Sequence, residues 1–226
     1  MNAARVVLAT HNTHKLAELR QILADVLDPD QVVGAAEVQA PDVAETGVTF
    51  AENALLKARE IAAHTGLIAV ADDSGLSVDV LGGAPGIFSA RWAGKHGDDA
   101  ANLDLLLAQL SDIGVEHRRA RFVCAAALAT PDGAHHVEYG YLHGTLLTEP
   151  RGEGGFGYDP ILVPDGESRS CAELTAEEKN AISHRGQAFT ALAEHIAAAV
   201  QGPAADDEES EQEDASADEG QGPLTN

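Results

Sequence analysis

Residues 68–75 read Ile-Ala-Val-Ala-Asp-Asp-Ser-Gly, an apolar segment that runs directly into two carboxylates, a hydroxyl and a glycine. The apolar part predicts a buried strand over Ile68–Ala71, with the acidic pair at its end. Carboxylates in that position can hold a hard cation while its other coordination positions stay open to a phosphate. A solvated Asp-Asp turn is the simpler alternative, so the interpretation depends on the segments around it.

Upstream of this strand, the chain alternates between strand and helix patterns. Residues 5–10 and 31–36 predict two strands, separated by a helix whose apolar residues recur at intervals of three and four. Thr49-Phe50-Ala51-Glu52 is a capping box that opens a helix reaching about Thr65.

Downstream, the pattern changes to a helix and then to an antiparallel hairpin. Residues 102–110 predict a leucine-rich helix, and two β-like runs over 120–130 and 135–147 flank a Pro-Asp-Gly turn. A second capping box at residues 175–178 and an amphipathic helix over 186–200 follow. This order predicts an α/β fold whose sheet is mixed rather than purely parallel.

Composition and charge limit the domain count and the partners. The 226 residues, 44% of them hydrophobic, suffice for one core with at most two lobes. Residues 203–226 carry nine acids and no base, which leaves 28 acids against 14 Lys and Arg up to Gly202, a net charge of −14. Such an acidic body argues against a nucleic-acid partner, because duplex binding needs clustered cations. We therefore predict a folded domain over residues 1–202 and a disordered acidic tail over 203–226.

Cysteine and histidine spacing indicates no structural metal and no disulfide. Cys124 and Cys171 lack a CxxC spacing and predict reduced, packed thiols. The chain shows neither a signal segment nor an apolar run of spanning length, so we expect no membrane partner and a cytoplasmic location. Seven histidines lack metal-ligand spacing and are interpreted as surface or packing residues: His64, His96, His117, His135, His136, His143 and His195.

A first short motif, over residues 10–15, predicts a phosphate cradle. It lies where a strand gives way to a helix, and free backbone N–H groups with a lysine one turn in bind anions there. On the following helix Asn53 and Lys57 are four residues apart, so both point off one face. The chain contains no Walker A pattern, and an ordinary helix cap with a surface lysine is the alternative.

A second motif, over residues 152–157, matches Gly-x-Gly-x-x-Gly, but prolines on both sides exclude the strand-to-helix setting of a dinucleotide fingerprint. We interpret it as a flexible loop that presents Phe156 and Tyr158 for stacking on a purine, with Asp159 as an acceptor. An aromatic residue packed under a glycine-rich loop is the alternative. A third motif gathers Lys179 and residues 183–186 around one helix start, which taken alone fits a capped helix with exposed basic residues.

Five segments, in order, resemble the inosine triphosphate pyrophosphatase family of dITP/XTP pyrophosphatases. They are THNTHK (10–15), AETGVTFAENALLKA (44–58), ADDSGLSVDVLGGAPGIFSARWAG (71–94), GGFGYDP (154–160) and LTAEEKNAISHRG (174–186), and the resemblance spans residues 5 to about 200. It implies an elongated, two-lobed α/β fold with a central mixed sheet flanked by helices and an active site in the cleft between the lobes. It also implies a homodimer that uses Mg²⁺ to hydrolyse ITP, dITP and XTP to the monophosphate and pyrophosphate.

The resemblance further implies roles for individual residues. Asp73 would be the catalytic base and, with Glu45, a ligand of Mg²⁺, while Lys57 and Ser74 would contact the substrate. The triphosphate would be held by Thr10, His11, Asn12, Thr13, His14 and Lys15. The nucleobase would be surrounded by Phe156, Gly157, Tyr158, Asp159, Lys179, His184 and Arg185.

Two physical expectations follow for such a site. Asp72 beside Asp73 is expected to raise the pKa of one of the pair, so that it can act as a base near neutrality. A carboxylate facing N1–H and a cation facing O6 would accept hypoxanthine and xanthine but leave buried groups unpaired opposite adenine. Asp159 is the candidate carboxylate, with Arg185 or Lys179 as the cation.

Two alternative functions stay open from the residues. One is a Maf-like pyrophosphatase of other base specificity, against which the loop around Phe156 and the Ser-His-Arg-Gly segment argue. The other is a catalytically silent nucleotide sensor that signals through the acidic tail. The intact pair Glu45 and Asp73 argues against a sensor, because a sensor need not retain a metal-bound water.

Overall fold

The computed structural model describes residues 5–10, 16, 20–24 and 27–201. Its strands are β1 (Val6–Leu8), β2 (Val32–Gly34), β3 (Ile68–Val78), β4 (Arg119–Ala129), β5 (His135–Leu146) and β6 (Leu162–Pro164). Its α-helices are α2 (Phe50–Thr65), α3 (Asp99–Gln109), α4 (Ala176–Ile182) and α5 (His184–Gln201). A short 3₁₀ helix, η3 (Gly86–Arg91), follows β3.

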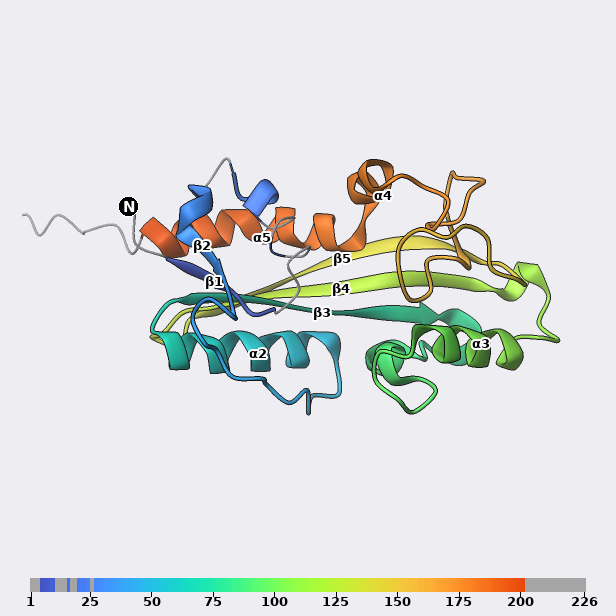
Figure 1. Cartoon of the computed structure of the whole chain (residues 1–226), viewed down its shortest axis with the longest axis horizontal. Helices are drawn as coiled ribbons and strands as arrows, with labels where there is room; N and C mark the ends of the chain where they lie inside the picture. Colours follow the sequence, from blue (N-terminus) through green and yellow to red (C-terminus); the bar gives the residue numbers. More distant parts are fainter. Residues whose placement is uncertain (1–4, 11–15, 17–19, 25–26, 202–226) are drawn as a thin grey trace, which may run out of the picture.

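The strands form one six-stranded sheet in the order β2-β1-β3-β4-β5-β6. β1 pairs in parallel with both β2 and β3, whereas the pairs β3–β4, β4–β5 and β5–β6 are antiparallel. The predicted mixed sheet is therefore confirmed. Figure 1 shows α2 and α5 on opposite faces of this sheet, and its long central strands give the molecule an elongated shape.

Helix α2 begins and ends where its sequence predicts. Thr49 Oγ1 accepts a hydrogen bond from the Glu52 N–H at 3.1 Å, and Glu52 Oε2 accepts one from the Thr49 N–H at 3.2 Å. These reciprocal bonds satisfy N–H groups that the first turn leaves without helical partners. Gly66 closes the helix in the left-handed region, with φ at 68°, which glycine adopts without steric cost.

Successive side chains of β3 pack in different hydrophobic clusters, one on each face of the sheet. Val70 packs in the cluster under α5 that contains Leu192 and Ile196, whereas Ala69 and Ala71 pack under α2. Both cysteines are buried and form no disulfide, which confirms the prediction of packed thiols. Within the described ranges, none of the helices combines the length and apolar character that crossing a bilayer requires. The predicted acidic tail over 203–226 lies outside the described residues.

The prediction that β3 ends at Ala71 is wrong. The strand continues to Val78, with Asp72 opposite Ala126 and Asp73 opposite Ala125 of β4. Aspartate and glycine disfavour strands, but the ladder of β4 supplies backbone partners along the whole length and overrides that local preference. The acidic pair therefore lies in the middle of a strand and not at its end.

The other edge of β3 is largely open. β1 pairs with it only as far as Val70, and among the described residues the next bridge on that edge joins Ser77 to Pro85. Leu76 on this edge donates its N–H to Ser89 Oγ of η3 at 2.8 Å, so we call residues 71–75 along this side the open edge of β3. It lies directly beyond the end of β1, where Thr10 leaves the sheet.

Candidate active site

Asp72 and Asp73 are neighbours in β3, but their side chains extend from opposite faces of the sheet. Successive side chains alternate across a strand. Asp73 accepts a hydrogen bond from Asn53 of α2, whereas Asp72 accepts one from Arg185 of α5. The acidic pair thus contributes to two polar sites, one on each face.

On the α2 face, Asp73 is held by two donors. Its Oδ2 accepts from Asn53 Nδ2 at 3.0 Å and its Oδ1 from the Ser74 N–H at 2.9 Å. Burial raises the pKa of Asp73 from its ordinary 3.8 to about 6, against the opposing effects of the Lys57 charge and the Asn53 hydrogen bond. A carboxylate with this pKa is poised to take up a proton near neutral pH.

Two further carboxylates contribute to this pKa. The charge on Glu45 raises the pKa of Asp73, and the charge on Asp72 raises it by the smallest contribution. The expectation that Asp72 has this effect is right in direction, but burial is the main cause.

Lys57 and Glu45 complete the cluster on the α2 face. Lys57 Nζ lies 2.5 Å from Glu45 Oε1, and both side chains are mostly shielded from solvent. The predicted face shared by Asn53 and Lys57 is therefore real: one reaches Asp73 and the other Glu45. The carboxylate oxygens of Glu45 and Asp73 are the hard donors that Mg²⁺ prefers, so the residues present fit that ion.

On the α5 face, Asp72 forms a buried pair with the first turn of α5. Its Oδ2 accepts from Ser74 Oγ at 2.9 Å and lies 3.4 Å from Arg185 Nε, while Arg185 Nη2 lies 3.4 Å from Ser74 Oγ. The side chains of Asp72 and Arg185 are 3% and 12% exposed. Ser74 thus contacts both sites, through its N–H on one face and its hydroxyl on the other.

A pocket of about 480 Å³ opens beside this pair and is lined from α4 and α5 as well as from η3 and α3. Its volume suits a small ligand such as a nucleoside. It is lined by all the residues expected around the nucleobase together with Ser74: Phe156, Gly157, Tyr158, Asp159, Lys179, His184 and Arg185. Segments far apart in the sequence are therefore brought to one cavity.

The two aromatic residues of the glycine-rich loop have different environments. Phe156 is 64% exposed, and Lys179 Nζ lies over its ring at 5.2 Å from the centroid. Tyr158 is only 5% exposed, and its hydroxyl donates to the Ser89 carbonyl at 2.9 Å. The expectation that the loop presents both rings is thus right for Phe156 and wrong for Tyr158, which packs in the core.

Asp159 holds the loop around Phe156 in place by accepting two hydrogen bonds. Asp159 Oδ2 accepts from the Phe156 N–H at 2.8 Å and from Lys179 Nζ at 2.5 Å, and the residue is 3% exposed. A Cβ at Gly155, where φ is 72°, would collide with this carboxylate, so the fold needs glycine there. The loop expected to be flexible is therefore fixed by a buried ion pair.

Two further predicted residues border the site. The His184 ring stacks on Phe122 of β4 with centroids 5.1 Å apart, which fixes the start of α5. Thr10 directly follows β1, and its N–H donates to the Leu8 carbonyl at 2.8 Å. The other residues of the predicted phosphate cradle, His11, Asn12, Thr13, His14 and Lys15, lie outside the described residues.

Sequence reasoning assigned no role in the site to three residues that organise it. Asn53 holds the carboxylate of Asp73, and its position one turn before Lys57 was a signal for this role. Asp99 Oδ2 accepts from the Gly157 N–H at 3.0 Å, and Ser89 accepts from Tyr158. No sequence signal connects these last two residues to a loop that lies so far along the chain.

Comparisons with known proteins identify the family. The model of the Ham1 family matches residues 6–195. A dITP/XTP pyrophosphatase of Streptomyces coelicolor is 70% identical over 189 residues, which cover 83% of this chain and 94% of that protein. A dITP/XTP pyrophosphatase of Corynebacterium efficiens is 54% identical, covering 85% and 97%.

Solved structures give the same result for the fold. A HAM1 protein from Coxiella burnetii superposes with a TM-score of 0.80 at 43% identity, covering 86% of this chain and 98% of that chain. The crystal structure of a nucleoside-triphosphatase, a dITP/XTP pyrophosphatase, from Mycobacterium abscessus superposes with a TM-score of 0.71 at 53% identity, covering 83% and 98%.

Proposed function

The chain belongs to the Ham1 family, and we infer that it is a nucleoside triphosphate pyrophosphatase that hydrolyses dITP and XTP to the monophosphate and pyrophosphate. The family match excludes the Maf-like alternative. The observation that carries the assignment in this chain is the pairing of a nucleobase-sized pocket with the carboxylate and lysine cluster around Asp73. We propose ITP as a further substrate, because it carries the same base as dITP.

We propose that the nucleotide lies across the open edge of β3. The base would occupy the pocket beside Asp72 and Arg185, and the triphosphate would reach the cluster of Glu45, Lys57 and Asp73 on the α2 face. Among the described residues no strand pairs with this edge between Val70 and Ser77, which supports a ligand that contacts both faces there. The cleft between two lobes expected for the family would correspond to this gap, with Thr10 at its border.

For the reaction, we propose that Asp73 accepts a proton from the water that attacks the α-phosphorus, while the bond to the pyrophosphate breaks. Its pKa of about 6 supports this role, because the group is ionised at neutral pH and still basic enough to hold a proton. Asn53 and the Ser74 N–H orient its carboxylate. Glu45 and Asp73 would hold Mg²⁺, which when bound offsets charge on the phosphate oxygens. Lys57 would add a second positive charge there.

For base selectivity, we propose that the ion pair of Asp159 and Lys179 reads the purine edge. Lys179 would donate to the 6-keto oxygen of hypoxanthine or xanthine, and Asp159 would accept from N1–H. Adenine instead has an amino donor at position 6 and an unprotonated N1. The Lys179 ammonium would then face a donor and the Asp159 carboxylate an acceptor, so neither would form its hydrogen bond. The shielding of this pair, with side chains 18% and 4% exposed, makes the mismatch costly. Phe156 would stack on the base from the mouth of the pocket.

The experiment that tests the function is product analysis with ITP, XTP, GTP and ATP in the presence of Mg²⁺. We expect pyrophosphate from ITP and XTP and very little turnover of GTP and ATP. Asp73→Asn should lower turnover by about 10²–10⁴-fold while nucleotide binding persists. Asp104→Asn on the exposed side of α3 is the matched control. Orthophosphate as product, or equal turnover of all four nucleotides, would refute the reaction or the base recognition respectively.

We also propose that the enzyme is a homodimer and works in the cytoplasm, where its free nucleotide substrates are found. Phe88 in η3 supports the first point, since it is 49% exposed and the Arg91 guanidinium lies over its ring, at 5.3 Å from the centroid. An exposed aromatic of this size is typical of a protein interface. Light scattering coupled to gel filtration should give twice the mass of the chain, and a monomer mass would contradict the proposal.

A further inference from the structure

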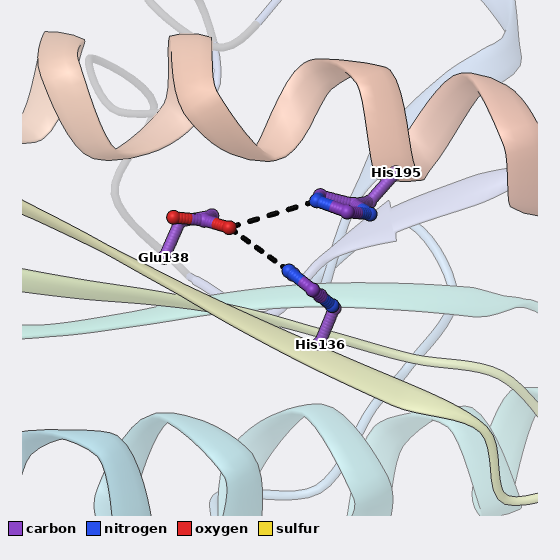
Figure 2. Close-up of side chains that lie close together, drawn as sticks. All are labelled: His136, Glu138 and His195. Atoms are coloured by element: carbon purple, nitrogen blue, oxygen red, sulfur yellow. Dashed lines mark hydrogen bonds and ion pairs between the residues drawn. The ribbon is translucent and has the colours of Figure 1, made fainter.

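A cluster of two histidines and one glutamate lies away from the nucleotide pocket. Figure 2 shows His136 and Glu138 on β5 facing His195 on α5. Glu138 Oε1 lies 2.9 Å from His136 Nε2 and 3.5 Å from His195 Nε2. The sequence shows no metal-ligand spacing because these three residues come from two elements that are far apart in the chain.

The geometry of this cluster fits a transition-metal ion. One atom from each side chain lies within 4.8 Å of the other two. In a tetrahedral zinc site with bonds of about 2.0–2.1 Å, neighbouring ligand atoms lie roughly 3.3 Å apart. The two measured separations to Glu138 bracket that value. Both imidazoles turn the same nitrogen, Nε2, toward the carboxylate. Their stacked rings, with centroids 3.4 Å apart, have to spread when a tetrahedral ion binds.

Charge and access also suit a metal dication. The side chains of His136, Glu138 and His195 are between 31% and 42% exposed, so an ion can enter and a water can take a fourth position. Neutral imidazole nitrogens and one carboxylate are ligands for Zn²⁺, Cu²⁺ or Ni²⁺, whereas Mg²⁺ prefers an all-oxygen set. The acidic body of the chain adds long-range attraction for any cation.

We propose that His136, Glu138 and His195 form a transition-metal site, of the class that binds Zn²⁺, which clips helix α5 to strand β5. The site is distinct from the Mg²⁺ position proposed at Glu45 and Asp73. His195 follows Arg185 by ten residues on α5, which corresponds to roughly 15 Å along the helix. The metal therefore acts as a structural clip on the helix whose first turn lines the nucleotide pocket, and it takes no part in hydrolysis.

The test is calorimetric titration of the full chain with Zn²⁺ in buffer that contains millimolar Mg²⁺. We expect one tight site in the wild type, and at least a tenfold loss of affinity in His195→Ala and in Glu138→Gln. His135→Ala is the matched control, because this neighbouring histidine points to the other face of β5, where Arg59 Nη2 lies 3.1 Å from its Nε2. The control should bind Zn²⁺ as the wild type does.

Thermal unfolding gives a second readout that does not depend on activity. Zn²⁺ at about 100 times its Kd should raise the Tm of a domain of this size by about 5–10 °C, and EDTA should reverse the shift. The shift should be absent in both site variants and present in the control. Zinc binding that survives in both variants, or a wild type that binds no zinc, would overturn the proposal. Pyrophosphatase activity with Mg²⁺ should be the same in all variants, so its loss would indicate a fault in the assignment of the active site instead.

Discussion

Replacing Asp73 by asparagine should make the protein more stable at pH 8 while it removes activity. The native protein keeps a proton on Asp73 up to about pH 6, whereas the unfolded chain releases it near 3.8. Between these values the native state binds more protons, so stability falls as pH rises, and the full loss is present above about pH 6. The ionised carboxylate is thus a cost to folding that the enzyme retains for its chemistry.

The structure sets the magnitude of this effect. A pKa raised from 3.8 to about 6 corresponds to roughly 3 kcal/mol, since each pKa unit is worth about 1.36 kcal/mol. Asparagine keeps an oxygen for Asn53 but turns an amide toward the Ser74 N–H, and that lost hydrogen bond costs about 1 kcal/mol. We therefore expect Asp73→Asn to raise the free energy of unfolding by about 2 kcal/mol at pH 8 and the gain to vanish near pH 4.

Urea denaturation followed by circular dichroism, at pH 8 and pH 4 in EDTA, measures this difference. Asp104→Asn should change the free energy of unfolding by less than about 0.5 kcal/mol at either pH, because it lies on the surface. A variant at position 73 that is less stable than the wild type at pH 8, or a gain that does not change with pH, would refute the reasoning. Turnover should fall by about 10²–10⁴-fold if Asp73 is the base.

Four other substitutions separate the roles within the site. Phe156→Ala should raise the KM for ITP about tenfold with Tm unchanged, since stacking is worth about 1–3 kcal/mol per base; an unchanged KM would exclude stacking. Tyr158→Phe should instead lower the free energy of unfolding by about 1 kcal/mol and leave KM unaltered, because it loses a buried hydrogen bond. Asp159→Asn should lower the ratio of kcat/KM for ITP over ATP by about 10²-fold, and a constant ratio measured in parallel assays would reject its role in selectivity. Asp72→Asn should move the acidic limb of the pH–rate profile by less than about half a pH unit, since its charge is the smallest cause of the raised pKa; a larger displacement would show that its influence is underestimated.

The elements that the sequence predicts well are those with local signals. The capping boxes at Thr49 and Thr175 mark the starts of α2 and α4, and both form their reciprocal hydrogen bonds. The hairpin of β4 and β5 follows from two β-like runs around a Pro-Asp-Gly turn. In each case the interacting residues lie within a few positions of one another, so periodicity and capping chemistry are sufficient.

The elements that the sequence does not predict depend on partners far along the chain. β3 continues through Asp72 and Asp73 because β4 runs beside it, and a strand propensity cannot contain that information. Asp72 is balanced by Arg185, which lies 113 residues away. Tyr158 is buried because a backbone carbonyl 69 residues away accepts its hydroxyl. These are tertiary contacts, which leave no periodic or compositional trace.

Because side chains alternate along β3, the face of the sheet on which each acid lies depends on its position in the strand. Asp73 belongs to one face and Asp72 to the other, so inserting a single residue between Ile68 and Asp72 would move each acid to the opposite face while the ladder to β4 stayed intact. The acid that meets Asn53 would then be Asp72, which now pairs with Arg185. Only an even number of inserted or deleted residues keeps both acids on their own faces, whereas the exposed turn between β4 and β5 can change length one residue at a time.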